Sequence, residues 1–192
     1  MIFAGVDTSG DHDPSSPLVV SVVLSDDSPS VKDSLLGKAV NEVRRALGKA
    51  NYVLHATDDS ESVRRLVVST FEKYGIRSRV VVFLDRGKAN RKGLLESLKG
   101  LDLRGTFAVY DNPLLDNVLE RLARKARKVS LGEELSLPLQ VADYFSYFWW
   151  ALFSGELKDF KAFEGVMVMT EEVKVVGFEK VVSLTASNEA SQ

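Results

Sequence analysis

Four aspartates occupy positions from which their carboxylates could act together. Three follow directly after short apolar segments that predict strands, and one interrupts an apolar helical segment: Asp7, Asp85, Asp111 and, in the helix, Asp143. The carboxyl ends of neighbouring parallel strands open onto one crevice, where these side chains are expected to gather. Clustered carboxylates repel one another unless a cation neutralises them, and carboxylate and water ligands suit Mg²⁺ or Mn²⁺. The pattern predicts a metal site that could align water with a scissile phosphate.

Each aspartate also has a structural interpretation. Aspartate is a common turn residue at strand ends, and this interpretation is favoured for Asp85, which precedes an Arg-Gly pair. A helix cap or a salt bridge could explain Asp143, but it shares a helix face with Gln140, where an unpaired carboxylate would be costly. We therefore expect Asp7, Asp111 and Asp143 to be catalytic metal ligands. Asp85 is a candidate fourth ligand. Gln140 is expected to orient the ligands through hydrogen bonds without contacting the metal itself.

Polar and basic residues near these aspartates suit a phosphate. Ser9 and Gly10 follow Asp7, and glycine permits a tight turn in which backbone and hydroxyl groups approach a phosphate. Arg86 and Lys88, near one strand end, are predicted to contact the substrate. A second basic cluster, within residues 121–128, is interpreted mainly as the favourable charge at a helix carboxyl end. A lone histidine at a strand end usually makes local hydrogen bonds, so His55 is not predicted to be catalytic.

The elements that must position these residues alternate between strands and helices. Apolar runs and turn residues predict a β-hairpin from residues 1–6 and 18–24, followed by strands at 52–56, 79–84 and 106–110. Helices are expected at 31–47, 58–75, 112–126 and from 138 onward, and a short helix ending at about residue 98 is expected after the strand at 79–84. A small hairpin is expected at 166–184 and a flexible tail at 185–192. The order predicts a single α/β domain over residues 1–184.

The last predicted helix is strongly aromatic. Its band of residues 144–150 is interpreted as core rather than as a surface on which bases stack. Trp149 and Trp150 cannot face the same way, because neighbours on a helix are about 100° apart. One of them is expected to be exposed or to lie in a homodimer interface formed by residues 144–153.

Composition excludes several classes of protein. The 192 residues include no Cys and only two His, which excludes disulfide scaffolds, thiolate zinc sites, cysteine nucleophiles and multi-histidine metal sites. Twenty-five basic and 27 acidic residues give a net charge of −2, so any attraction to nucleic acid must come from local clusters. The most apolar stretch, 141–153, is shorter than the ~20 residues of a membrane span. The amino terminus does not resemble a signal peptide, and we expect a cytoplasmic protein without a membrane partner.

Two motifs, with the strands between them, carry a resemblance. The segments are Asp7-Thr8-Ser9-Gly10-Asp11-His12, Leu54-His55-Ala56, the strand ending at Asp85, Tyr110-Asp111 and Leu139-Gln140-Val141-Ala142-Asp143-Tyr144. In this order they resemble a widespread uncharacterised prokaryotic domain family of the ribonuclease-H-like clan. Its usual signatures are Asp-Glu-Ser-Gly near the start and Leu-Gln-Leu-Ala-Asp near the end. The resemblance covers about residues 1–155.

The resemblance implies a ribonuclease-H-like α/β fold, with a central mixed β-sheet flanked by helices, and a metal-dependent nuclease site. Asp7, Asp111 and Asp143 match its acidic positions, whereas Thr8 stands where the family has glutamate. The leading hypothesis is therefore a nuclease that hydrolyses DNA or RNA with Mg²⁺ or Mn²⁺. The alternative is a non-catalytic nucleic-acid-binding or protein-interaction module in which Thr8 marks an eroded site. A phosphotransferase or phosphatase of the wider fold is less favoured, because the sequence has no Gly-x-x-x-x-Gly-Lys loop.

Overall fold

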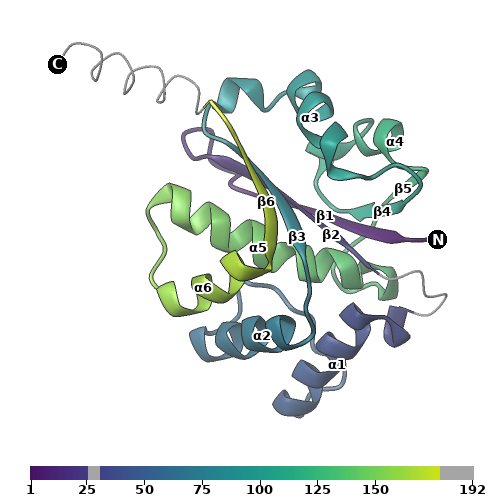
Figure 1. The fold of residues 1–192 in the computed structure, drawn as a ribbon, viewed down its shortest axis with the longest axis vertical. Helices are drawn as coiled ribbons and strands as arrows, with labels where there is room; N and C mark the ends of the chain where they lie inside the picture. Colours follow the sequence, from purple (N-terminus) through teal and green to yellow (C-terminus); the bar gives the residue numbers. More distant parts are fainter. Residues whose placement is uncertain (26–30, 178–192) are drawn as a thin grey trace.

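The computed structural model describes residues 1–25 and 31–177, which form a six-stranded sheet in the order β5-β4-β1-β2-β3-β6 (Figure 1). The strands are β1 (Phe3–Ser9), β2 (Leu18–Leu24), β3 (Ser78–Phe83), β4 (Phe107–Tyr110), β5 (Lys125–Lys128) and β6 (Thr170–Val176). The β2 strand is antiparallel to both of its neighbours, and the other pairings are parallel. Because β1 and β4 are parallel neighbours, their carboxyl ends lie side by side at the same end of the sheet.

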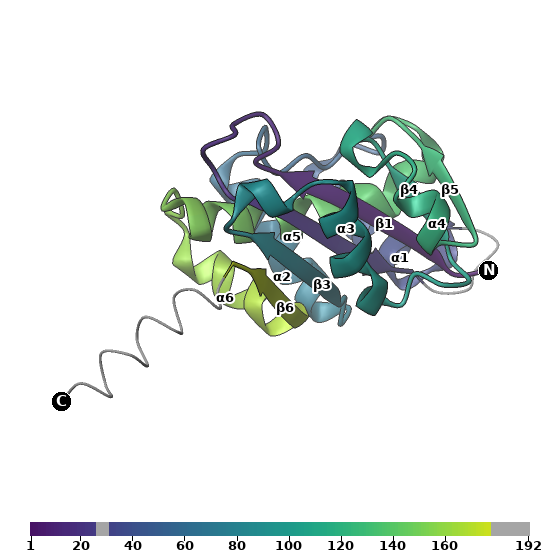
Figure 2. The ribbon, with the colours of Figure 1, turned by 90° about the horizontal axis from the view of Figure 1, so that it is seen from above.

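Helices cover both faces of this sheet, and each face has its own apolar core. One face packs against α1 (Leu35–Leu47), α2 (Glu61–Lys73), α5 (Leu137–Ser154) and α6 (Phe160–Met169), and the other against α3 (Arg91–Leu98) and α4 (Leu119–Leu122). Figure 2 shows α3 in front of the sheet and α2 and α5 behind it. Short 3₁₀ helices occur at η1 (Val31–Asp33), η2 (Arg86–Lys88), η3 (Lys99–Leu101), η4 (Pro113–Leu115) and η5 (Glu134–Ser136). The sheet is thus mixed and flanked by helices, as predicted.

The α5 helix crosses the sheet at very short range. Gly5 of β1 makes this possible, because a Cβ atom there would lie 2.0 Å from the carbonyl oxygen of Pro138. Ser21 of β2 donates a hydrogen bond to the carbonyl oxygen of Ala142 at 2.6 Å. This contact between α5 and the sheet sets Asp143 above the strand that carries Asp7. Within the described residues, no helix combines the length and the apolar character needed to cross a membrane.

Most of the predicted elements are confirmed, but residues 52–56 do not form the expected strand. Two of their backbone N–H groups bond to side chains of α5 instead of to a neighbouring strand. The Leu54 N–H donates to Oε1 of Gln140 at 3.0 Å, and the Ala56 N–H donates to Oδ2 of Asp143 at 2.7 Å. The apolar character of this segment therefore reflects burial against a helix.

Two predictions near sheet edges are wrong. The helix expected through residue 126 is limited to η4 and the short α4, because Asn117 has φ 61° and Ala123 is extended; the chain then enters β5. The hairpin expected at 166–184 is replaced by the end of α6 and by β6, which pairs with β3 in parallel. The remainder of that hairpin and the predicted tail at 185–192 lie outside the described residues.

Candidate functional site

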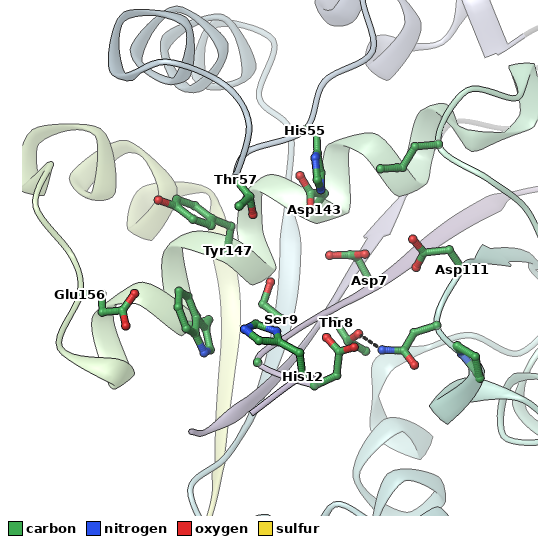
Figure 3. A pocket seen from close by; sticks show the side chains of 16 residues that line it. Asp7, Thr8, Ser9, His12, His55, Thr57, Asp111, Asp143, Tyr147 and Glu156 are labelled. Atoms are coloured by element: carbon green, nitrogen blue, oxygen red, sulfur yellow. Dashed lines mark hydrogen bonds between the residues drawn. The ribbon is translucent and has the colours of Figure 1, made fainter. Parts of the chain in front are cut away.

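A cavity of about 580 Å³ opens at the carboxyl ends of β1 and β4 (Figure 3). Most of its lining comes from residues 7–12, the segment around His55, the turn after β4 at 111–113, and the face of α5 from Asp143 to Trp150; Leu131 and Glu156 complete it. Three of the four predicted ligands, Asp7, Asp111 and Asp143, therefore share one cavity. Its described lining contains no Lys or Arg side chain.

Asp7 lies within β1, which continues to Ser9 instead of ending before the aspartate as expected. Its side chain is only 5% exposed and accepts a 2.5 Å hydrogen bond from Oγ of Ser146, which in turn accepts from Oγ of Ser9 at 3.0 Å. Burial raises the pKa of Asp7 well above its ordinary value, and the carboxylates of Asp143 and Asp111 raise it further. The Ser146 hydrogen bond opposes this rise. Asp7 is thus a fixed carboxylate in a site that disfavours its negative charge.

Asp143 faces Asp7 from α5 and is 7% exposed. Burial raises its pKa to about 6, although the Ala56 N–H and the nearby His55 oppose the rise. Asp111 follows β4 and is less deeply buried, and burial also raises its pKa. Figure 3 shows the three carboxylates directed toward a common space. Their charges therefore destabilise one another when all three are ionised.

The donor chemistry of this set fits a divalent cation. Three carboxylates offer the oxygen ligands that Mg²⁺ and Mn²⁺ prefer, and a bound cation would remove the repulsion between them. In the arrangement of the described side chains, no group of three or more His, Asp or Glu is close enough together to hold a metal ion. Metal binding at this site would therefore require the side chains to move. Asp111 is the least deeply buried of the three carboxylates.

The structure does not bring Asp85 to the cavity, because β2 separates β3 from β1. Asp85 caps η2 instead and accepts from the N–H of Gly87 at 3.1 Å. Arg86 donates to the carbonyl oxygens of Gly10 at 2.7 Å and Asp11 at 3.1 Å, so it fastens the loop after β1. Lys88 lies away from the cavity, in a separate hollow beside α3 and β6. Of the predicted phosphate contacts, Ser9 and Gly10 line the cavity.

Gln140 joins two loops to α5 and makes no hydrogen bond to a candidate ligand. Its Oε1 accepts from the N–H of Leu54, and its Nε2 donates to the carbonyl oxygen of Leu131 at 2.9 Å and to Oγ of Ser136 at 3.0 Å. It therefore positions the segment that carries His55.

Although burial lowers the pKa of His55, its hydrogen bond with Asp58 and nearby carboxylates raise the pKa above its ordinary value.

Replacing Gln140 with Leu is expected to lower the free energy of unfolding by about 2 to 4 kcal/mol, because it leaves the buried N–H of Leu54 and the carbonyl oxygen of Leu131 without this partner. Urea denaturation measures the change. Asn41, a partly exposed amide on α1, provides the control Asn41→Leu, for which a change within about 0.5 kcal/mol is expected. Equal effects of the two substitutions would contradict the positioning role.

Only part of the second basic cluster is at a helix carboxyl end: Arg121 lies in the last turn of α4, whereas residues 125–128 form β5 at the edge of the sheet. Lys128 pairs with Asp116 at 2.9 Å, and the ammonium of Lys125 lies 5.2 Å from the centre of the Phe107 ring.

The aromatic band at residues 144–150 is divided between the core and the cavity. Its core members are Tyr144, Phe145, Phe148 and Trp149, whereas Tyr147 and Trp150 line the cavity.

Ser146 is a site residue that the sequence reasoning missed. It lies three residues after Asp143, so helical spacing alone places both on one face of α5. Glu156 and Thr57 also line the cavity without having been predicted. The homodimer through residues 144–153 stays a prediction.

A scan against protein-family models and a search of curated proteins each found no match. Solved structures do match. A chain from the PCNA:RNase HII complex of Archaeoglobus fulgidus is 20% identical, with a TM-score of 0.54, over 84% of this chain and 79% of that one. Ribonuclease H2 from Pyrococcus horikoshii OT3 is 14% identical, with a TM-score of 0.54, over 84% and 78%. These similarities confirm the predicted ribonuclease-H-like fold.

Proposed function

We propose that this chain hydrolyses phosphodiester bonds of DNA or RNA, with Mg²⁺ or Mn²⁺ held by Asp7, Asp111 and Asp143. The observation that carries the proposal is the convergence of these three carboxylates, with raised pKa values, in a cavity whose described lining has no Lys or Arg. Such a site is costly unless a cation occupies it. The similarity to archaeal RNase HII structures and the motifs at both ends of residues 1–155 support a nuclease.

The residues of the chain would hold and orient the reacting groups. When bound, the metal supplies an activated water and stabilises charge on the leaving oxygen. Ser146 fixes the carboxylate of Asp7, and the N–H of Ala56 fixes that of Asp143. Ser9 and Gly10 lie where backbone and hydroxyl groups can approach a phosphate.

A second candidate function is a non-catalytic module that binds nucleic acid or protein. One observation favours it: Oγ1 of Thr8, at the position of the family glutamate, accepts a hydrogen bond from Nδ2 of Asn112 at 2.5 Å. This contact links β1 to the turn after β4 without adding a carboxylate. If that glutamate is a metal ligand in the family, its replacement by Thr8 weakens metal binding. The non-catalytic module is therefore expected to bind metal more weakly than the nuclease.

Calorimetric titration with Mn²⁺ tests the proposal. We expect micromolar to millimolar binding by the wild type and loss of binding by Asp7→Asn, because the variant removes a charged ligand and keeps the side-chain shape. Asp85→Asn is the matched control, since Asp85 lies outside the cavity, and it should bind like the wild type. Absence of Mn²⁺ binding by the folded wild type, with and without an oligonucleotide, would reject the nuclease and favour the module.

A further inference from the structure

One end of the cavity is aromatic, and the metal-binding proposal does not use it. Tyr147 and Trp150 project from α5, with ring centroids 6.5 Å apart and ring planes inclined at 40°. The ring centroid of His12, in the loop after β1, lies 6.4 Å from that of Trp150. All three side chains line the cavity that holds the carboxylates. Figure 3 shows His12 and Tyr147 on the side of the cavity away from Asp111.

The surrounding chain holds the rings of Trp150 and Tyr147 in place. A Cβ atom on Gly10 would lie 2.7 Å from Cδ1 of Trp150, so the loop backbone packs directly against the edge of the indole. The indole N–H donates to Oγ of Ser16 at 3.4 Å, and the guanidinium of Arg64 lies 5.2 Å from the centre of the Tyr147 ring. Rings that are already oriented lose little entropy when a ligand binds.

The two ends of the cavity differ in chemistry, so a ligand that fills both should have two chemical parts. Near Asp7, Asp111 and Asp143, a ligand would bind through a cation and should therefore carry an anionic group. Near Trp150 and Tyr147, it should carry a flat ring that can stack. A nucleotide has both parts, because its phosphate can bind the metal while its base stacks on an aromatic side chain.

We propose that Trp150, together with Tyr147 and His12, forms a stacking subsite for one unpaired nucleobase next to the bound phosphate. The identity of that phosphate as the scissile group rests on the proposed function, whereas stacking of the base does not. A base inside an intact duplex is covered on both faces by its neighbours and cannot present a face to Trp150. The cavity therefore selects single-stranded or locally unpaired nucleic acid over continuous duplex.

The two tryptophans of the chain provide a reporter and its control. Trp149 is 7% exposed, donates to Oγ1 of Thr170 at 3.0 Å and packs against Phe163, away from the cavity. Trp149→Phe leaves Trp150 as the only indole, and Trp150→Phe leaves only Trp149. Both proteins are titrated in Mg²⁺ with single-stranded oligothymidylate, an abasic strand of equal length, a blunt duplex and thymidine 5′-monophosphate, while tryptophan fluorescence is followed.

Saturable quenching by oligothymidylate is expected in Trp149→Phe and not in Trp150→Phe. The abasic strand and the duplex should not quench. Trp150→Ala should weaken binding of oligothymidylate by about 5- to 150-fold, the range that corresponds to stacking of one base, and Trp150→Phe by much less. Quenching by the monophosphate as well would identify a free nucleotide as a sufficient ligand, and quenching by the strand alone would identify the polymer. Either result supports the subsite.

Equal binding of the abasic and normal strands, equal quenching by duplex and single strand, or quenching of Trp149 alone would overturn the proposal. The outcome is separable from that of the proposed function. Cleavage of nucleic acid without quenching of Trp150 would reject the subsite and leave the nuclease intact. Quenching without Mn²⁺ binding or cleavage would reject the nuclease and leave a nucleotide-binding cavity.

Discussion

Asp143→Asn is expected to abolish cleavage of nucleic acid and, at neutral pH, to make the protein more stable. The proposed metal contributes several kcal/mol to transition-state stabilisation, and 4 kcal/mol corresponds to about a thousandfold in rate, so cleavage should fall by at least about 10³-fold. Stability should rise because the variant removes a buried negative charge. Its amide oxygen can still accept from the N–H of Ala56, as Asp143 does.

The pH dependence of this gain follows from the raised pKa of Asp143. The pKa is about 6 in the folded protein against an ordinary value of 3.8, so the folded state binds this proton more tightly than the unfolded state. Ionisation of Asp143 therefore costs no stability below about pH 4, and the cost grows as the pH rises through about 6 and is constant above that. The difference between these two pKa values corresponds to roughly 3 kcal/mol.

Thermal unfolding of both proteins at several pH values measures this effect. At pH 7.5 without metal, the variant should unfold roughly 6 to 12 °C above the wild type, and near pH 4 the difference should vanish. Mg²⁺ should raise the unfolding temperature of the wild type more than that of the variant, because binding to the folded state stabilises it. A variant that is less stable than the wild type at pH 7.5, or one that retains cleavage, would contradict the role of Asp143.

The sequence predicted site residues correctly where their position within a strand or helix was enough to place them. Asp7 and Asp111 could be placed together because parallel strands open onto a common edge, and Asp143 because a carboxylate is unusual in an apolar helix. Asp85 follows a strand in the same way, yet it lies outside the cavity. Strand order decides this difference, and strand order depends on long-range pairing that no local pattern contains.

The errors in the fold have a similar origin. Residues 52–56 have the apolar character of a strand, but the N–H groups of Leu54 and Ala56 bond to side chains of a helix more than 80 residues later. The residues at 121–128 carry charges that suit a helix end, but Arg121 is the only charged one that lies in a helix, because Ala123 is extended and residues 125–128 form β5. In both cases a tertiary contact or one backbone angle outweighs the local pattern.

The aromatic helix shows what amphipathic reasoning could have found. Asp143, Tyr147 and Trp150 share one face at helical spacing, which already places two rings beside a candidate ligand. The high aromatic content favoured a core for the band, with one of the two tryptophans expected to be exposed or to lie in a homodimer interface. Trp149 does belong to the core, whereas Trp150 lines the cavity. The sequence therefore predicted two different environments for the tryptophans, and the face shared with Asp143 indicates which of them lies in the cavity.

Gly5→Ala is expected to damage the site without touching any candidate ligand. The new Cβ atom would lie 2.0 Å from the carbonyl oxygen of Pro138 and 2.6 Å from the backbone nitrogen of Leu139, so β1 and α5 must separate. Neither backbone can turn aside as a flexible side chain would. Overpacking of this kind costs typically 1 to 3 kcal/mol and sometimes more, and we expect a loss of about 3 kcal/mol in the free energy of unfolding.

The same separation should weaken metal binding, because Asp7 lies on β1 while Asp143 and Ser146 lie on α5. Urea denaturation measures the stability of Gly5→Ala, and Mn²⁺ calorimetry under conditions where the variant is folded measures the site. Gly100→Ala is the control, since a Cβ atom at Gly100 meets nothing within 4 Å. If Gly5→Ala kept the stability and Mn²⁺ affinity of that control, α5 could not be packed directly on β1. The carboxylates would then owe their proximity to some other contact.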